Sequence, residues 1–170
     1  MDLWAIGHVQ KLAQAVDKAY KAFEFHEIYS RVHQFCSGFL SAYYFDVLKD
    51  TLYTAKKDSP LRRSAQTGLF YILSSLVRAV APILPFTADE VWNSFAIGET
   101  CSVHAADLLL SELKVLSGPS GKQRCREWEL LYDLRNAVTP FLERKREATL
   151  IGSSLDAKVF LFTEDQELRQ

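Results

Sequence analysis

Apolar residues recur along this chain at spacings of three and four, the period of an amphipathic α-helix. The first such stripe consists of Leu3, Ile6, Val9, Leu12, Val16, Tyr20 and Phe23. Lysines and other polar residues fill the positions between them. A second stripe begins near Ile28 and continues to about Leu52. The pattern therefore predicts two helices joined by a short turn.

The third predicted helix has a clear start signal. Ser59 can cap its first amides, and Pro60 suits the first helical position, where no amide hydrogen is needed. Apolar residues continue over a wide arc to Val80, which predicts a central position in a bundle. Pro82 and Pro85 are expected to end this helix.

A capping pattern predicts a short fourth helix. The Thr87 hydroxyl and the Glu90 carboxylate have the spacing of a capping box. Phe86 and Val91 stand where a hydrophobic staple would pack. This helix is expected to stop at Gly98.

A fifth helix is predicted from about Gln123, after an irregular stretch at residues 99–122 in which residues 117–121 mark a turn. Pro140 lies inside the helical pattern, so we expect a kink near Val138. The side chains expected to face inward are Trp128, Leu131, Leu134, Val138, Phe141 and Leu142.

Residues 157–162 have a composition that favours a strand. Because a lone strand is not stable, we interpret this tail as the opening of a further domain. The predicted organisation is a helical bundle at residues 1–150, followed by the start of a truncated domain at residues 151–170. The fold class is therefore an all-α bundle of about five helices with a short C-terminal strand-forming tail.

Composition narrows the classes of function that this chain can have. The formal net charge is −1, with 20 Lys and Arg against 21 Asp and Glu, so any nucleic-acid site must be a local patch. No apolar run approaches the ~20 residues of a membrane span, and the N-terminus lacks the pattern of a signal peptide. A cytoplasmic protein without membrane contact is expected. Reduced thiols are expected at three dispersed cysteines, Cys36, Cys101 and Cys125.

The chain offers no constellation for catalysis. No glycine-rich loop lies between a strand and a helix, and no pair of histidines has metal-ligand spacing. We therefore predict no catalytic residue, no metal site and no bound cofactor in this chain.

The most informative segment is basic. Five cations fall between residues 49 and 66, against two aspartates, Asp50 and Asp58. Arg62 and Arg63 would lie in the first turn of the third helix, where exposed cations cost roughly 0.3–1 kcal/mol each. A bound phosphate would reverse that cost, because helix amides and guanidinium groups would converge on it. The alternative is a solvated charge run in which the aspartates pair locally.

A second basic group, residues 144–146, ends the fifth helix. Cations are favourable at a helix C-terminus, so complementation of the helix dipole explains this group without a ligand.

Two runs in the basic region carry a family resemblance. Residues 44–53 (YFDVLKDTLY) and residues 59–67 (SPLRRSAQT) resemble the anticodon-binding bundle of class I aminoacyl-tRNA synthetases. The second run favours the isoleucyl-tRNA synthetases. Residues 81–92, 102–104 and 151–157 are similar to later segments of the same domain, and they occur in the same order as in that family. One departure is Thr51, which stands where the family often has arginine.

This resemblance implies a binding module without an active site of its own. The module would position isoleucine tRNA, through its anticodon stem and loop, for ATP-dependent aminoacylation by a catalytic domain of the same polypeptide. ATP and Mg²⁺ would serve that domain, whose signatures His-x-Gly-His and Lys-Met-Ser-Lys-Ser do not occur here. The residues expected to contact tRNA are Lys56, Lys57, Arg62, Arg63, Gln66 and Tyr53.

Within this set the four cations would contact phosphates, while Tyr53 and Gln66 would contact unpaired bases. Two alternatives remain open: the corresponding domain of a valyl- or leucyl-tRNA synthetase, and a helical protein–protein interaction domain that uses its apolar stripes.

Overall fold

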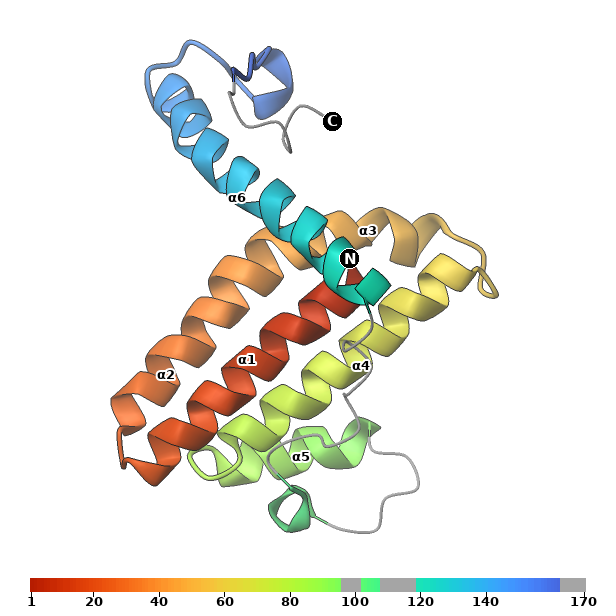
Figure 1. The fold of residues 1–170 in the computed structure, drawn as a ribbon, viewed down its shortest axis with the longest axis vertical. Coiled ribbons are helices and arrows are strands. Elements are labelled where there is room, and N and C mark those ends of the chain that lie inside the picture. Colours follow the sequence, from red (N-terminus) through yellow and green to blue (C-terminus); the bar gives the residue numbers. More distant parts are fainter. Residues whose placement is uncertain (96–101, 108–118, 163–170) are drawn as a thin grey trace. The chain divides into compact units, whose positions relative to one another are not determined.

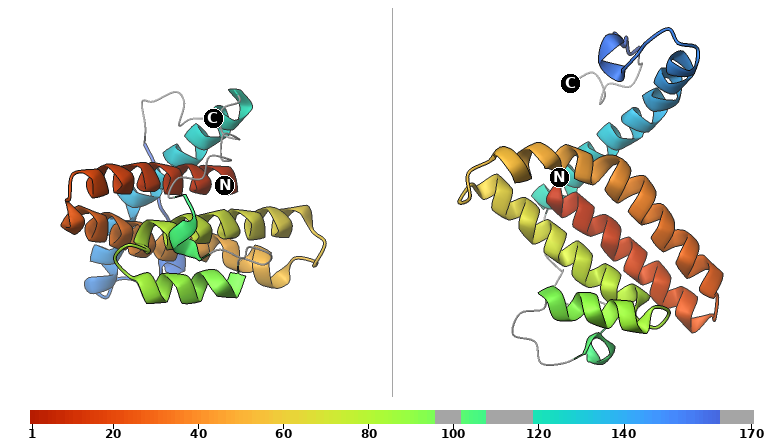
Figure 2. Two further views of the ribbon diagram at one scale, coloured as in Figure 1. Left: turned by 90° about the horizontal axis from the view of Figure 1, so that it is seen from below. Right: turned by 180° about the vertical axis from the view of Figure 1, so that it is seen from behind.

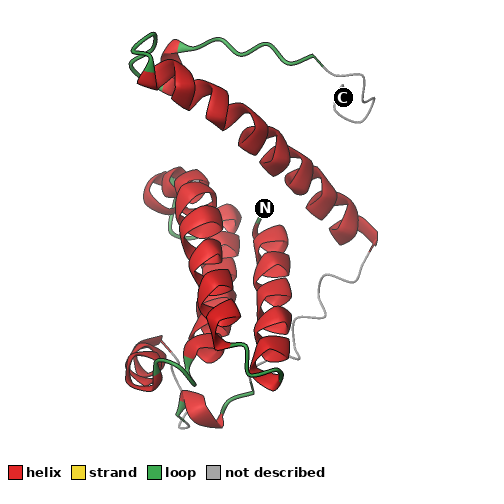
Figure 3. Cartoon of the chain, turned by 90° about the vertical axis from the view of Figure 1, so that its left-hand side faces the viewer, coloured by secondary structure: helices red, strands yellow, loops and turns green. Residues whose placement is uncertain are grey.

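The computed structural model describes residues 1–95, 102–107 and 119–162, and each regular element in these ranges is a helix (Figure 3). The predicted all-α class is confirmed. The longer helical elements are α1 (Asp2–Lys21), α2 (Phe25–Gln34), η1 (Phe35–Tyr44), α3 (Phe45–Thr54), α4 (Pro60–Val80), α5 (Pro85–Phe95) and α6 (Pro119–Glu147). Two short 3₁₀ helices are η2 (Val103–Ala105) and η4 (Ser154–Asp156).

The chain divides into two compact units, Met1–Gly118 and Pro119–Gln170. In the first unit, α1 lies between the rod formed by α2, η1 and α3 and the long helix α4 (Figure 1 and Figure 2). Helices α1 and α4 run in the same direction, and the α2–α3 rod runs in the opposite one. Helix α5 packs against α4. The predicted domain boundary after residue 150 stays a prediction.

The α2–α3 rod is continuous, as the second stripe predicted, but its middle part is a π-helix. There the amide of Phe45 donates to the carbonyl of Leu40, five residues earlier. Periodicity of three and four did not predict this wider winding. The π segment carries aromatic side chains that pack against α1. The centre of the Trp4 ring lies 5.0 Å from that of Phe39 and 5.8 Å from that of Tyr43.

The turn from α1 to α2 satisfies the last carbonyls of α1. The amide of Glu24 donates to the Ala19 carbonyl at 2.9 Å, and the amide of Phe23 donates to the Tyr20 carbonyl at 3.1 Å. This is the pattern of a Schellman motif. Phe23 occupies its left-handed position with φ of 58°, where glycine is the usual residue.

Helices α1, η1 and α4 meet around the carboxylate of Asp2. The fully buried Tyr44 donates its hydroxyl to Asp2 Oδ1 at 3.1 Å, and the Ser64 hydroxyl donates to Asp2 Oδ2 at 2.5 Å. A Cβ atom on Gly68 would lie only 2.8 Å from the Tyr44 hydroxyl oxygen. Glycine at this point of α4 therefore permits the close approach on which the hydrogen bond depends.

This contact predicts a stability loss at alkaline pH. Burial, and then the negative charge and hydrogen bond of Asp2, raise the pKa of Tyr44. Above about pH 10 the unfolded chain loses this proton while the folded chain keeps it, so stability should fall by up to about 1.4 kcal/mol per pH unit. Below that pH the contribution is complete. Urea unfolding between about pH 8 and 11 measures how the free energy of unfolding depends on pH. In Tyr44→Phe this free energy should fall less steeply as the pH rises, and an equal pH dependence in the two proteins would contradict the assignment.

The starts of α4 and α5 differ from the capping predictions. Pro60 occupies the first turn of α4 as predicted, but the Ser59 side chain makes no capping hydrogen bond. Helix α5 begins at Pro85, so Thr87 lies inside its first turn and the capping box is wrong. The staple is also wrong, because the side chain of Phe86 is 88% exposed. Proline starts α5 because its fixed φ and missing amide hydrogen suit a first helical position.

Besides the buried residues around α1, a second core lies where α5 packs against the C-terminal half of α4. Its buried members are Val77, Ala81, Ala88, Trp92 and Val103. Helix α4 ends at Val80, close to the predicted end. The predicted stop of α5 at Gly98 lies outside the described residues.

The second unit consists of α6 and the segment that follows it. Helix α6 begins at Pro119, so the turn predicted at residues 117–121 is wrong from that proline onward. The helix continues through Pro140, and a kink near Val138 stays a prediction. Leu131 and Phe141 were expected to face inward, but their side chains are 52% and 65% exposed.

The expected strand is not confirmed. Residues 157–162 form no strand, since no partner strand accompanies them in the part of the chain that the structure describes. The segment just before this tail is held by the side chain of Asp156. Its Oδ2 accepts hydrogen bonds from the amides of Gly152 at 3.2 Å and Ser153 at 2.7 Å.

Candidate nucleic-acid interface

The predicted site residues gather around the turn between α3 and α4. Helix α3 ends at Thr54 and α4 begins at Pro60, so five residues connect them. Within this turn the amide of Ser59 donates to the Lys56 carbonyl at 3.0 Å. The amide of Arg63 then donates to the Ser59 carbonyl at 3.0 Å, which closes the first turn of α4. The backbone therefore has a defined course around the two lysines.

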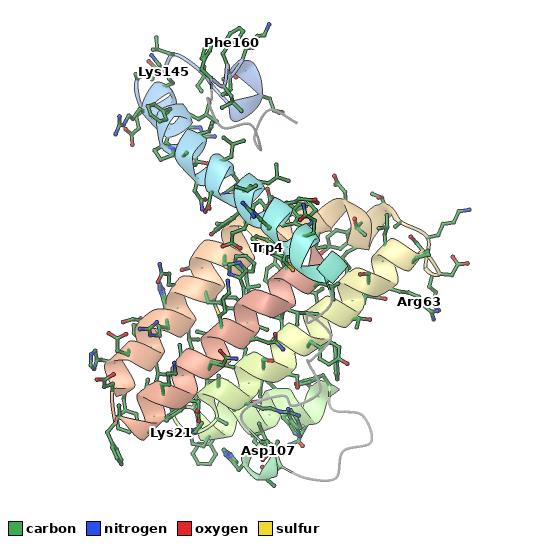
Figure 4. All side chains as sticks on the ribbon, in the orientation of Figure 1. Trp4, Lys21, Arg63, Asp107, Lys145 and Phe160 are labelled. Atoms are coloured by element: carbon green, nitrogen blue, oxygen red, sulfur yellow. The ribbon has the colours of Figure 1, made fainter. Side chains whose placement is uncertain are left out.

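Most of the predicted contact residues present their side chains to solvent. Lys56, Lys57, Arg63 and Gln66 are exposed, and Tyr53, in the last turn of α3, is 85% exposed. Figure 4 shows Arg63 near the end of α4 that adjoins the turn. This exposure leaves cations and an aromatic ring available to a ligand.

Local charge pairing does not account for the basic segment. Within the described ranges, no ion pair joins Asp50 or Asp58 to a neighbouring lysine or arginine. Among the cations of residues 49–66, all of which the structure describes, Lys49 alone forms an ion pair: its Nζ lies 2.8 Å from Asp46 Oδ1. This hydrogen bond and the charge of Asp46 raise the pKa of Lys49. The alternative of an internally paired charge run therefore fits Lys49 and not the cations of the turn.

Arg62 and Arg63 are neighbours in sequence but point to different surroundings. Arg62 Nη1 donates to the carbonyl of Ala55 at 3.0 Å, across the turn. Its Nε is buried and has no hydrogen-bond partner among the described residues. Arg63 instead lines a shallow hollow on the surface of α4. Successive helical residues are separated by about 100° around the axis, which explains the divergence.

The hollow beside Arg63 has a volume of about 340 Å³ and combines several kinds of chemistry. Its residues are Arg63, Gln66, Thr67, Phe70 and Tyr71. A cation, an amide, a hydroxyl and two aromatic rings together suit a phosphate with an unpaired base. Sequence reasoning included the first two residues and missed the other three, although a spacing of three and four would have placed all five on one helical face.

The second basic group lies in the last turn of α6 and has local partners. Arg146 Nη1 contacts the two carboxylate oxygens of Glu143 at 2.9 and 3.0 Å. The Arg144 guanidinium lies 5.7 Å from the centre of the Phe141 ring. These contacts, together with the favourable helix dipole, agree with the structural interpretation of this group.

Metal ligation and membrane insertion have no support among the described residues. Among the described residues, no group of three histidine, cysteine, aspartate or glutamate side chains is placed to hold a metal ion. Cys36 and Cys125 are free thiols, and Cys101 lies outside the described residues. None of the described helices is both long and apolar enough to cross a membrane.

Comparison with known proteins gives one consistent result. Residues 2–161 match the family described as the anticodon-binding domain of tRNA ligase. An isoleucine–tRNA ligase of Teredinibacter turnerae is 39% identical over 166 residues, which cover 98% of this chain and 18% of the relative. Those of Syntrophotalea carbinolica and Thioalkalivibrio sulfidiphilus are 41% and 42% identical, over 95% and 96% of this chain and 17% of each relative. The chain thus spans about a sixth of the length of these curated relatives.

Proposed function

Because the chain belongs to the family of anticodon-binding domains of tRNA ligases, we propose that it is the tRNA-binding module of an isoleucine–tRNA ligase. In this proposal it holds the anticodon stem and loop of isoleucine tRNA. A catalytic domain of the same polypeptide joins the amino acid to that tRNA. The relatives named above are isoleucine–tRNA ligases, which favours isoleucine over the valine and leucine alternatives.

One observation carries this proposal: exposed cations and an exposed aromatic ring meet at the α3–α4 turn of a chain whose net charge is only −1. A local basic patch of this kind suits a polyanion. The exposed cations Lys56 and Lys57 of the turn and Arg63 of the first turn of α4 contact phosphates. Tyr53 and Gln66 contact bases of the loop, whose faces and edges are accessible when unpaired. The full proposed interface consists of Tyr53, Lys56, Lys57, Arg62, Arg63 and Gln66.

The proposal places the chemistry elsewhere in the polypeptide. In this proposal ATP and Mg²⁺ serve the catalytic domain. Every regular element in the described part of this chain is a helix, so that part offers no strand–loop–helix phosphate site. This chain contributes binding and orientation of the tRNA. The proposed compartment is the cytoplasm, and the helical bundle at residues 1–150 precedes a further domain that begins in residues 151–170.

The test is a titration of the 170-residue chain with two labelled RNAs, the anticodon stem-loop of isoleucine tRNA and its acceptor minihelix. We expect the stem-loop to bind more tightly. Three phosphate contacts predict that its log K falls with log salt at a slope of about −2 to −3. Equal affinities and equal slopes for the two RNAs would contradict recognition of the anticodon arm. Absence of binding to either RNA would favour the alternative of a protein–protein interaction domain.

A further inference from the structure

The direction of the Arg62 side chain gives this residue a different task from Arg63. Arg62 lies in the first turn of α4, which contains no acidic residue and has no side-chain cap. A cation there opposes the positive end of the helix dipole. Its own helix therefore does not explain the position of this arginine.

The preceding helix does explain it. The residue after α3 is Ala55, and its carbonyl accepts from Arg62 Nη1 at 3.0 Å. The carbonyls at a helix C-terminus lack partners within their helix and attract cations. The last turn of α3 contains no basic residue. Arg62 thus ties the first turn of α4 to the residue that follows α3, seven positions earlier in the chain.

The guanidinium of Arg62 is also less available to a ligand. Its Nε is buried, so the edge formed by Nε and one Nη cannot be offered to a phosphate in solvent as a two-pronged donor. Arg63, in contrast, is exposed and borders the hollow on α4.

We infer that Arg62 is a positioning residue: it ties the end of α3 to the start of α4 and so holds the turn that carries Lys56 and Lys57. This inference rests on the proposed function for its consequence in tRNA binding. A turn ordered before binding avoids the loss of conformational entropy that ordering at the moment of binding would impose. Arg62 therefore raises affinity through the lysines, while Arg63 and the lysines contact phosphates.

The first arm of the test needs no RNA. Limited digestion with a lysine-specific endoproteinase, followed by mass spectrometry, reports opening of the turn at Lys56 and Lys57. Arg62→Met should accelerate cleavage there about tenfold, because a charge-assisted hydrogen bond that closes the turn is lost. The matched control, Arg63→Met, removes the same charge one residue away and should leave the rate within about twofold. Neither variant adds or removes a cleavage site.

Cleavage after Lys11 and Lys18, inside α1, separates local opening from general unfolding. Their rates should be the same in Arg62→Met and in the unmodified chain. If these sites accelerate as much as the turn, or if the two variants open the turn equally, Arg62 does not position the turn.

The second arm measures stem-loop affinity against salt. Arg63→Met should lower the magnitude of the log–log slope by about 0.7–0.9, as expected for one lost phosphate contact. Arg62→Met should weaken binding at every salt concentration and leave the slope unchanged. An equal loss of slope in both variants would make Arg62 a phosphate contact and overturn the inference. If the unmodified chain binds no RNA, the proposed function fails, and the role of Arg62 in the turn is decided by the proteolysis.

Discussion

Replacing Trp92 by alanine is expected to lower the free energy of unfolding of the N-terminal unit by about 3–5 kcal/mol. The Trp92 side chain is only 1% exposed and belongs to the second core, which includes residues of α4, α5 and η2. Removing the indole takes away its apolar burial and leaves a cavity that a packed helix pair fills only in part.

A cation adds to this loss. The Arg78 guanidinium lies 5.0 Å from the centre of the Trp92 ring, and Arg78 Nε is buried with no hydrogen-bond partner among the described residues. The electron-rich face of the indole partly compensates the desolvation of this half-buried cation. In the Trp92→Ala protein that face is gone, so the charge is less well accommodated.

Unfolding in guanidinium chloride, monitored by the circular dichroism of the helices, measures the change in the free energy of unfolding. The control is Phe86→Ala, which removes another aromatic ring from the same helix. Phe86 is exposed, so this variant should stay within about 0.5 kcal/mol of the unmodified chain. A loss below about 1 kcal/mol for Trp92→Ala, or equal losses for the two variants, would mean that α5 does not pack on α4 through this ring.

The largest expected effect on binding comes from removing the three exposed cations of the proposed interface together. The variant Lys56→Met, Lys57→Met, Arg63→Met should bind the anticodon stem-loop on the order of a hundredfold more weakly at about 0.1 M salt. The slope of its log K against log salt should be smaller in magnitude by about 2–3, because fewer counterions are released on binding when phosphate contacts are lost. The three side chains are exposed, so stability should change little.

A control with the same change in net charge distinguishes a site from a general charge effect. The variant Arg144→Met, Lys145→Met, Arg146→Met removes three cations from the last turn of α6. We expect a modest loss of stability, because favourable dipole and local contacts disappear, and little change in affinity. Equal losses of affinity in the two triple variants would place the basic turn outside the binding site.

The interface illustrates how far sequence reasoning can reach. The cations, Tyr53 and Gln66 were recognisable from local charge, a helix start at Pro60 and the family resemblance, and membership of that family is confirmed. Their roles as tRNA contacts stay predictions. Phe70 and Tyr71 fall within the third predicted helix but were not singled out, because a wide apolar arc does not reveal which of its residues α4 leaves at the surface.

The helices themselves were largely determined by local sequence. A 3.6-residue period and the proline at the start of α4 act within a few residues, so α1, the α2–α3 rod and α4 were predicted close to their observed bounds. The errors at α5 and α6 have a common origin: Pro85 and Pro119 were taken as signs of a stop or a turn, although proline also begins helices.

Tertiary structure decided the features that depend on segments distant in sequence. The Tyr44–Asp2 hydrogen bond joins residues 42 positions apart, and it exists because Gly68 of a third helix leaves room for it. The direction of Arg62 depends likewise on where the end of α3 lies in space. A sequence states that a cation is present at a helix start, but only the packing of two helices determines whether its charge is used by a neighbouring carbonyl or offered to a ligand.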